Sequence, residues 1–470
     1  MLFRSPSIDL ATYFPGENAD GVCCMARDAQ GMVYLAGFTF SELFPRVSDE
    51  FRKGLGSNLR DGWVMKIDPK ASGNDLILYS SYFGATAEED IFAMTVDAQG
   101  LVYLAGVTNS FDFPTTPNGF VTSFQGGTNR IFVSVLDTTK GEGGLFYSTL
   151  FGGTKGDQAT AIAVRNGKIY VTGFTTSDDF PVVNALQGTK SGSYDGFIAQ
   201  FDPSAGTGKD SLPFSSYFGA SGQDIPRAIA VDASGAVYVS GITYSFDFPV
   251  TPDAYQPFYR GQGDSFVTKI DIGANAILYS TYFGGSGTDY ARKMILDAAG
   301  RVALTGYTFS SNLPVTQNAL QTVNSGNGDA FLTVLDPNVS GAGGLVYSTY
   351  FGGSDGDVAY DVARDTAGRY VICGYTLSQD FPVRNALNPM SAQGGADGFV
   401  AVIDPGATFG SALAYSSLIT SDGLQTAYAC SIGSDGVIVT GVSTGVLFGP
   451  NDSQPTNVGG YNVFLLIFRP

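Results

Sequence analysis

The chain contains no histidine. A Ser-His-Asp or Cys-His nucleophile, a His-ligated zinc site and the usual proton shuttle near neutral pH all need this side chain, so the sequence excludes them. An enzyme built on this chain would have to use carboxylates, tyrosine, lysine or a bound metal ion. No catalytic motif is recognised, so the sequence predicts no catalytic residue and favours a protein that is not an enzyme.

Cysteine is also scarce, and Cys23, Cys24, Cys373 and Cys430 are the whole set. Their spacing fits neither a zinc site nor a redox motif. Cys23 and Cys24 fall in the first repeat unit and Cys430 in the last, and these units would be neighbours in a closed ring. A bridge from Cys430 to one of the pair is one interpretation, although its geometry is demanding. The other is that all four are small buried apolar side chains.

Positive charge is in the minority, because 25 Lys and Arg face 43 Asp and Glu and give a net charge of −18. Phosphate binding needs clusters of Lys and Arg, and the basic residues here are scattered, so the sequence predicts no nucleic-acid partner. The acidity also disfavours anionic membrane surfaces. It suits a protein that binds cations or basic partners.

Long apolar runs are missing as well. A membrane-spanning helix needs about 18 or more consecutive apolar residues, so no membrane insertion is predicted. The first residues, Met-Leu-Phe-Arg-Ser-Pro-Ser, lack a charged leader followed by an apolar segment and do not form a signal peptide. A removed leader, a longer parent protein and a cytoplasmic chain all stay open.

A repeated phrase, Tyr-Ser-Thr-Tyr-Phe-Gly-Gly or a close variant, runs through the whole chain. Its central residue is Tyr13, Tyr82, Leu150, Tyr217, Tyr282, Tyr350 and Leu418 in turn, so the steps are 69, 68, 67, 65, 68 and 68 residues. A fixed period of this kind indicates a repeat architecture. Seven copies fill the 470 residues and leave no room for a second domain.

Each unit predicts four antiparallel strands. In the fourth unit they are Asp224–Val231, Ala236–Thr243, Asp264–Asp271 and Ala276–Phe283, rich in β-branched and aromatic residues and bounded by Gly, Pro, Asp and Ser. The turn Asp232–Gly235 has the glycine that a tight hairpin requires. Four-stranded units repeated seven times favour a seven-bladed β-propeller.

The ends of the chain predict how the ring closes. The sequence begins with a fourth-strand motif, residues 8–14, and ends with a third-strand motif, residues 461–468. The N-terminal strand would complete the last blade and leave no long edge unpaired. The expected blades of this all-β, single-domain chain are residues 15–83, 84–151, 152–218, 219–283, 284–351, 352–419, and 420–470 plus 7–14.

Three motifs recur in fixed order: T-x-S-x-D-F-P-V, D-G-F-V-x-x-I-D and Y-S-T-Y-F-G-G. In this order they resemble the bacterial β-propeller repeat called SBBP, over essentially the entire chain. The resemblance implies a β-propeller from a secreted or surface-attached bacterial protein, hence an extracellular or cell-surface location. The biochemical role of that family is poorly defined, so the resemblance implies the fold much more than a function.

Carboxylates open the first strand of six units. They are Asp20, Glu89, Asp157, Asp224, Asp289 and Asp357, with Gln425 in the seventh. First strands are innermost in a propeller, so these side chains are expected to ring one mouth of the central channel. One interpretation is a cation site, with Ca²⁺ as the candidate because all ligands are oxygen. The other is that each carboxylate accepts backbone N–H bonds in the connection between blades.

Two further sets of acids repeat. One follows the second strand and comprises Asp112, Asp179, Asp247 and Asp380, with Asn312 in the fifth unit. The other opens the third strand and comprises Asp61, Asp195, Asp264, Asp329 and Asp397, with Arg130 and Asn462 in units two and seven. A cation site in each blade is conceivable, but the pattern favours structural hydrogen bonding to loops.

Basic residues break the repeat on the first strands of units four and five. Arg227, Arg292 and Lys293 stand where other units have Phe92, Thr160 or alanine. They either pair with the acids or form a pocket for an anionic group at blades four and five.

Loop aromatics after the second strands are the other binding candidates. Phe111, Tyr244, Phe246 and Phe309 are expected to be exposed, where they would stack on a sugar or anchor a protein. The long loops follow the second strands, so a protein or glycan partner is expected on that face.

The sequence therefore favours a non-enzymatic binding or scaffold module. Two alternatives stay open. One is a carboxylate-dependent polysaccharide hydrolase or lyase, because glycoside hydrolysis needs only two suitably spaced acids. The other is a carbohydrate-binding lectin.

Overall fold

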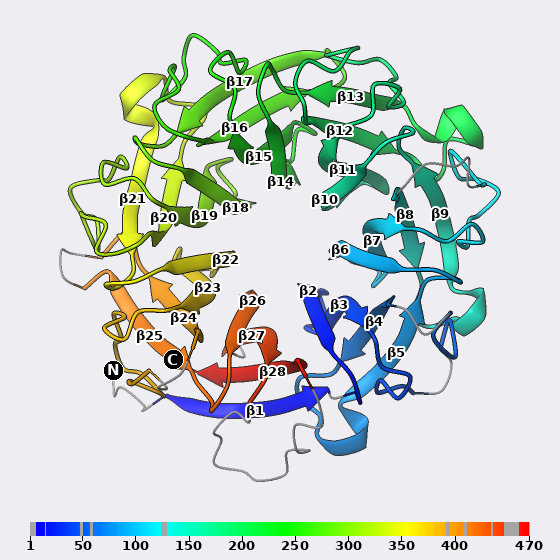
Figure 1. The fold of residues 1–470 in the computed structure, drawn as a ribbon, viewed down its shortest axis with the longest axis horizontal. Coiled ribbons are helices and arrows are strands. Elements are labelled where there is room, and N and C mark those ends of the chain that lie inside the picture. Colours follow the sequence, from blue (N-terminus) through cyan, green and yellow to red (C-terminus); the bar gives the residue numbers. More distant parts are fainter. Residues whose placement is uncertain are drawn as a thin grey trace. The chain divides into compact units, whose positions relative to one another are not determined.

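The computed structural model describes residues 6–14, 16–47, 50–56, 60–123, 129–391, 395–407, 411–433, 436–445 and 460–469. The fold is an all-β, seven-bladed β-propeller, with each blade a four-stranded antiparallel sheet (Figure 1). Short 3-10 turns, Gly73–Asp75 (η1), Gly141–Gly143 (η2), Gly208–Ser211 (η3) and Gly341–Gly344 (η4), precede the fourth strands of blades one, two, three and five.

The strands follow the predicted order in every blade. Blade one is β2 (Asp20–Arg27), β3 (Val33–Thr39), β4 (Asp61–Ile67) and β5 (Ile77–Phe83). Blade two is β6 (Glu89–Val96), β7 (Val102–Thr108), β8 (Arg130–Leu136) and β9 (Leu145–Phe151). Blade three is β10 (Asp157–Arg165), β11 (Lys168–Thr175), β12 (Asp195–Phe201) and β13 (Phe214–Phe218). Blade four is β14 (Asp224–Val231), β15 (Val237–Thr243), β16 (Asp264–Asp271) and β17 (Ala276–Phe283).

The remaining blades have the same construction. Blade five is β18 (Asp289–Leu296), β19 (Val302–Thr308), β20 (Asp329–Leu335) and β21 (Leu345–Phe351). Blade six is β22 (Asp357–Arg364), β23 (Tyr370–Thr376), β24 (Asp397–Ile403) and β25 (Leu413–Ile419). Blade seven is β26 (Gln425–Gly433), β27 (Gly436–Ser443), β28 (Asn462–Arg469) and β1 (Ser7–Phe14).

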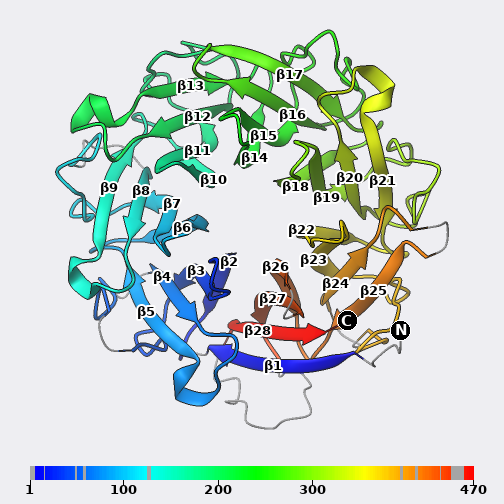
Figure 2. The ribbon, with the colours of Figure 1, turned by 180° about the vertical axis from the view of Figure 1, so that it is seen from behind.

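The N-terminal strand completes blade seven, as the sequence predicts. β1 pairs antiparallel with β28, from Ser7 opposite Arg469 to Phe14 opposite Val463, and the two strands lie side by side in both views (Figures 1 and 2). Arg469 Nε also donates to Asp9 Oδ2 at 2.8 Å. The last blade therefore has its four strands from both ends of the chain, and β28 has no unpaired edge.

The tight turn between first and second strands is held by an aspartate. In blade four, Asp232 Oδ1 accepts the backbone N–H groups of Ser234 and Ala236, at 2.9 and 3.0 Å. Gly235 has φ of +92°, a conformation that glycine adopts without steric cost. This local chemistry sets the pairing of β14 with β15, which shifts register once, between Pro226 and Ala228.

The chain divides into two compact units. One comprises Met1–Val22, Pro252–Ser265 and Tyr282–Pro470, and contains blades five, six and seven. The other comprises Cys23–Thr251 and Phe266–Thr281, and contains blades two and three together with most of blades one and four.

Aromatic residues fill the space between neighbouring sheets. In the second unit, Phe180 from the Phe-Pro motif lies 4.7 Å from Phe151 and 4.8 Å from Phe197, measured between ring centroids. Phe180 is 3% exposed, and burying a side chain of this size is worth about 1.5–3 kcal/mol. The Phe-Pro phenylalanines Phe113, Phe248 and Phe381 are buried too, so the repeated motif supplies a core residue in these blades.

The tyrosine of the repeated phrase ties the long connection to the sheet. In blade five the buried Tyr350 hydroxyl donates to Ser310 O and accepts from Leu313 N, both at 2.8 Å. In blade three Tyr217 makes the same two bonds, to Ser177 O at 2.8 Å and from Phe180 N at 3.0 Å. One hydroxyl thus holds the first residues of each of these connections in place.

We expect Tyr350→Phe to lower the free energy of unfolding by about 1–3 kcal/mol, because it leaves a buried carbonyl and a buried N–H without their shared partner. Tyr347→Phe is the matched control in the same strand, since its buried hydroxyl has no hydrogen-bond partner within the described residues. Denaturant unfolding of both variants measures the difference. Equal destabilisation by the two substitutions would contradict this role of the Tyr350 hydroxyl.

Candidate functional site

The first-strand carboxylates are buried and hold the connections between blades. Asp224 is 0% exposed; its Oδ2 accepts from Ala220 N at 2.7 Å and Ser245 Oγ at 2.9 Å, and its Oδ1 from Thr243 Oγ1 at 2.5 Å. Asp157 and Asp289 have the same three kinds of partner, a backbone N–H, a threonine and a serine. Each carboxylate therefore links the end of one blade to the second strand of the next.

The remaining members of the set have similar environments. Asp20, Glu89 and Asp357 are 0–1% exposed and accept from Gly16 N, Ala85 N and Gly353 N, each at 2.8 Å. Gln425 accepts from Ser421 N at 3.0 Å through its amide oxygen. These contacts agree with the interpretation in which each carboxylate accepts backbone N–H bonds in the connection between blades. Among the residues that the structure describes, no group of three or more His, Cys, Asp or Glu could hold a metal ion, so the Ca²⁺ site is a prediction without support from this geometry.

A first-strand acid of one blade faces a third-strand acid of the blade before it. At Gly284, a Cβ atom would lie 2.6 Å from Asp289 Oδ2 and 2.7 Å from Asp264 Oδ1, so both oxygens converge on the space that the glycine leaves empty. Glu89 and Asp61 converge on Gly84 in the same way, and Asp357 and Asp329 on Gly352. Any side chain at these glycines would displace the carboxylates.

Burial of these pairs raises their pKa values. Loss of hydration, with repulsion from the facing carboxylate as a smaller cause, raises the pKa of Asp61 and Asp264 to about 7. Burial raises that of Asp329 and of Asp357 to about 6. The Oδ1 atoms of Asp61, Asp264 and Asp329 have no hydrogen-bond partner within the described ranges. At a pH below these values, protonation of one acid in each pair removes the cost of two facing charges.

At three of the seven positions where the third strand of one blade meets the first strand of the next, another residue replaces one of the two facing acids and so avoids this repulsion. Gln425 replaces the first-strand acid in blade seven, and Asn462 replaces the third-strand acid there. In blade two Arg130 stands at the third-strand position, donates to Gly152 O at 2.7 Å and lowers the pKa of Asp157 against the dominant effect of burial.

We expect the free energy of unfolding to fall as pH rises from about 4 to about 7. Acids whose pKa is raised in the native state bind more protons there than in the unfolded chain, so their contribution is complete below pH 4 and is lost through the native pKa. Asp264→Asn should reduce the dependence of the free energy of unfolding on pH. It should also stabilise the protein at pH 8, by on the order of 1–3 kcal/mol. Urea unfolding at pH 5, 6, 7 and 8 measures both effects.

Asp380→Asn is the matched control, because bonds from Ser354 lower the pKa of this exposed carboxyl. Its titration lies below the pH window, so the slope between pH 5 and 8 should stay that of the wild type. A wild-type stability that rises between pH 5 and 8 would contradict the proton-sharing pairs.

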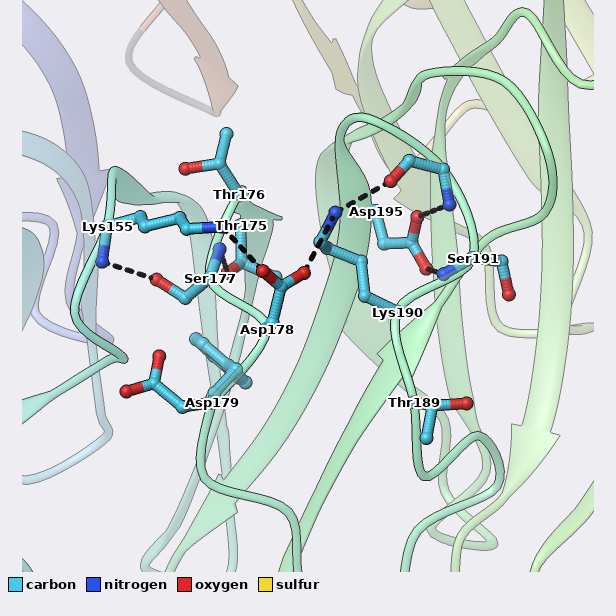
Figure 3. Close-up of polar contacts among 12 residues, drawn as sticks. Lys155, Thr175, Thr176, Ser177, Asp178, Asp179, Thr189, Lys190, Ser191 and Asp195 are labelled. Carbon is cyan, nitrogen blue, oxygen red and sulfur yellow. Dashed lines mark hydrogen bonds and ion pairs between the residues drawn. The ribbon is translucent and has the colours of Figure 1, made fainter.

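The acids after the second strands brace the loops, as the hydrogen-bonding interpretation predicts. Asp247 Oδ1 accepts from Ser221 N and Oγ at 3.1 and 2.6 Å, and Asp112, Asp179, Asn312 and Asp380 accept from the equivalent residue of their own blades. In blade three the neighbouring Asp178 bridges Lys155 and Lys190 at 2.5 and 3.4 Å (Figure 3). These carboxylates are occupied by loop contacts.

Arg292 lies in a pocket of tyrosines formed by blades five and six. Its guanidinium carbon is 4.4 Å from the ring centroid of Tyr360, 5.4 Å from that of Tyr290 and 5.8 Å from that of Tyr307. Tyr290 and Tyr307 stack at 5.3 Å, and Tyr360 contacts Tyr428 at 4.9 Å. Tyrosine faces hold an arginine by cation–π attraction without neutralising its charge.

The charge of Arg292 has no counter-ion among the described residues. No described carboxylate forms an ion pair with it, and its buried Nε has no hydrogen-bond partner there. A buried guanidinium N–H that is left without an acceptor costs free energy.

A cavity of about 350 Å³ opens beside this guanidinium. Its lining includes Tyr307, Phe309, Tyr375 and Leu377, with Asn327 and Asp355 at the edge. Phe309 and Leu377 directly follow β19 and β23, where the long connections of blades five and six begin. The cavity therefore lies at a loop end of two blades and combines one cation, an aromatic wall and a polar edge.

The other predicted binding residues lie elsewhere. Lys293 pairs with the buried Asp361 at 3.7 Å, and this carboxylate also accepts from Cys430 N at 2.9 Å. Arg227 lies on β14 and does not line the cavity. The loop aromatics Phe111, Tyr244 and Phe246 are 78%, 39% and 76% exposed, and Phe309 is 57% exposed, so their predicted exposure is confirmed.

Sequence reasoning identified Arg292 and Phe309 but missed the tyrosines around them. Tyr360 and Tyr428 occupy the position of Arg292 in blades six and seven, three residues after the opening acid or glutamine. Aligning that position across all units would have shown Arg-Tyr-Tyr in three successive blades, in a column that elsewhere holds Cys23, Phe92, Thr160 and Arg227.

The cysteines differ from both interpretations, because Cys23 and Cys24 are neither bridged to Cys430 nor free apolar side chains. Cys23 and Cys24 form a disulfide with each other, and Cys373 and Cys430 are buried free thiols. A bridge from Cys430 to the first-unit pair is therefore wrong, because both of its partners are already used. Burial raises the pKa of the Cys373 and Cys430 thiols, so these two behave as the apolar side chains of the other interpretation.

No helix in the described part of the chain is long and apolar enough to cross a membrane.

No family model matches the chain, so the resemblance to the SBBP repeat remains a prediction. The chain is 25% identical over 380 residues to the regulatory protein FlaEY of Caulobacter vibrioides, across 77% of this chain and 37% of that protein. It thus spans little more than a third of that relative's length.

Solved β-propellers are similar in structure at low identity. The Dos1 propeller matches 99% of this chain and 97% of its own, with 11% identity and a TM-score of 0.42. The β-propeller domain of the Trilobed protease from Pyrococcus furiosus matches 95% of this chain and 93% of its own, with 10% identity and a TM-score of 0.42.

Proposed function

We propose that this chain is a non-enzymatic binding or scaffold module and that it binds its partner at the Arg292 pocket, lined by Arg292, Tyr307, Phe309, Tyr375 and Leu377. The single observation that carries the proposal is a guanidinium without a counter-ion in an aromatic cavity. A purely structural arginine would pair with one of the chain's many carboxylates, as Lys293 does with Asp361.

The environment of the acids supports binding rather than polysaccharide cleavage. A glycosidase needs two carboxyl groups that reach the glycosidic bond from either side. The first-strand acids are 0–2% exposed and make repeated contacts with their own loops. Acids in repeated, buried environments favour a bracing role over two distinct catalytic roles.

The cellular setting is part of the same proposal. The SBBP-like motifs support a secreted or cell-surface bacterial protein. The name of the Caulobacter relative, a regulatory protein, is compatible with a module that acts by binding. Both a protein and a glycan are partners that an aromatic pocket at a loop end accommodates.

Saturation-transfer NMR tests the proposed site without assuming a ligand class. A panel of short peptides, amino-acid derivatives, neutral sugars and uronic acids is screened against the wild type, Arg292→Met and Arg227→Met. We expect ligands whose signal is lost in Arg292→Met. Arg227→Met is the matched control, because Arg227 holds the same repeat position in blade four, and it should retain the signal.

Two outcomes would overturn this proposal. One is a panel in which no ligand depends on Arg292. The other is release of reducing or unsaturated ends from a polysaccharide by the purified wild-type chain, which would establish the hydrolase or lyase alternative. Neutral sugars that bind equally to wild type and Arg292→Met would favour the lectin at another site.

A further inference from the structure

The Arg292 pocket has polar groups of opposite sign at two places. The guanidinium lies among Tyr290, Tyr307 and Tyr360. Asp355 is exposed at the edge of the same cavity. Phe309 and Leu377 also line the cavity; they supply apolar surface and are 57% and 45% exposed. A ligand that fits must present an anionic group to the guanidinium, a hydrogen-bond donor to Asp355 and an apolar group to Phe309 and Leu377.

We infer that the Arg292 pocket binds an amino-acid residue with a free α-carboxylate, an α N–H donor and an apolar side chain. This inference rests on the proposed function and names its ligand class. The chemistry is shared by the C-terminal residue of a peptide and by a free apolar amino acid, and the experiment below separates these two sources.

The carboxylate is matched to Arg292. A guanidinium presents donors in a rigid fork that a carboxylate accepts bidentately. Arg292 lines the cavity, and a ligand carboxylate there would be the counter-ion that this arginine lacks among the described residues. Three tyrosine rings lie around it, and a lower local dielectric strengthens a charge-assisted hydrogen bond.

The N–H donor is matched to Asp355. Its Oδ1 accepts from Asn327 Nδ2 at 3.2 Å and from Gly356 N at 2.9 Å. No bond to its Oδ2 forms in the described part of the chain. These two bonds fix the carboxylate at the cavity edge while Oδ2 stays available for a donor on the ligand, either an amide N–H or an ammonium group.

The apolar side chain is matched to the aromatic wall. Tyr307 and Phe309 meet edge to face with ring centroids 5.7 Å apart, and Phe309 lies against Gly328, where a Cβ would approach its ring within 2.8 Å. Phe309 is thereby held in place beside the cavity of about 350 Å³. This volume suits one amino-acid side chain with its carboxylate, and ligand sites of this size bind mainly through apolar contact.

A ligand with several negative charges is disfavoured. The chain has a net charge of −18, and Asp355 and Asp357 both line the cavity. One carboxylate pairs with Arg292, whereas further carboxylates or sulfates would face these acids and the field of the whole protein. Polyuronates and sulfated glycans are therefore poor candidates.

Isothermal titration with four probes tests the ligand class. They are N-acetyl-L-phenylalanine, its uncharged amide, free L-phenylalanine and the tripeptide Gly-Gly-Phe. We expect the acid to bind at least about tenfold more tightly than the amide, because a charge-assisted bond is lost. Arg292→Met should abolish this difference, while Arg227→Met keeps it. Tighter binding of Gly-Gly-Phe identifies a peptide C-terminus as the source, and tighter binding of phenylalanine identifies a free amino acid.

Circular dichroism and thermal unfolding will show whether Arg292→Met folds. If it does not, Asp355→Asn and Phe309→Ala still test the inference. Asp355→Asn should weaken free phenylalanine at least about fivefold, since its ammonium loses a charged acceptor, and Phe309→Ala should weaken all four probes. Equal binding of acid and amide, or probe binding unchanged in all three variants, overturns the inference. If the NMR panel still yields ligands that need Arg292 but lack an α-carboxylate, the ligand class is wrong while the proposed function stands.

Discussion

The buried carboxylate that opens the first strand in six of the seven blades is the interaction on which these blades depend. Asp224 accepts from Ala220 N, Thr243 Oγ1 and Ser245 Oγ, so one side chain joins the end of blade three to the first two strands of blade four. A buried carboxylate without such donors would cost several kcal/mol. With three donors it fixes where a strand begins, where a long connection leaves the sheet, and how consecutive blades follow each other.

The same arrangement carries a cost that the chain reduces in different ways. Because the third strand of the preceding blade also opens with an acid, Asp264 faces Asp289 over Gly284. A shared proton relieves such a pair below neutral pH, an amide replaces one partner at Gln425 and Asn462, and Arg130 supplies an opposite charge beside Asp157. The repeat therefore preserves the hydrogen bonds of the junction while its charge varies from blade to blade.

Sequence predicted most of the fold and little of the site. The period of the Tyr-Phe-Gly phrase and the offset of the chain ends were enough for seven blades and for the pairing of β1 with β28, because strand pairing within a repeat is local. Facing acids such as Asp61 and Glu89 were not predicted to pair, since they belong to different repeats and meet only when blades pack. Tyr360 was missed for the same reason, because it comes from β22 of the next blade, whereas Tyr290 and Tyr307 lie on β18 and β19 of the same blade as Arg292.

Repetition also separates structural from functional residues in this chain. The first-strand acid recurs in six blades, and Gln425 takes its place in the seventh. A group that recurs in this way answers a need that the blades share, and its buried, hydrogen-bonded environment agrees with that. Arg292, Tyr360 and Tyr428 hold the same repeat position in three neighbouring blades, and this combination occurs only there. It leaves a cation without a described counter-ion beside a cavity. A propeller needs no such feature to fold, which is why we propose that it serves ligand binding.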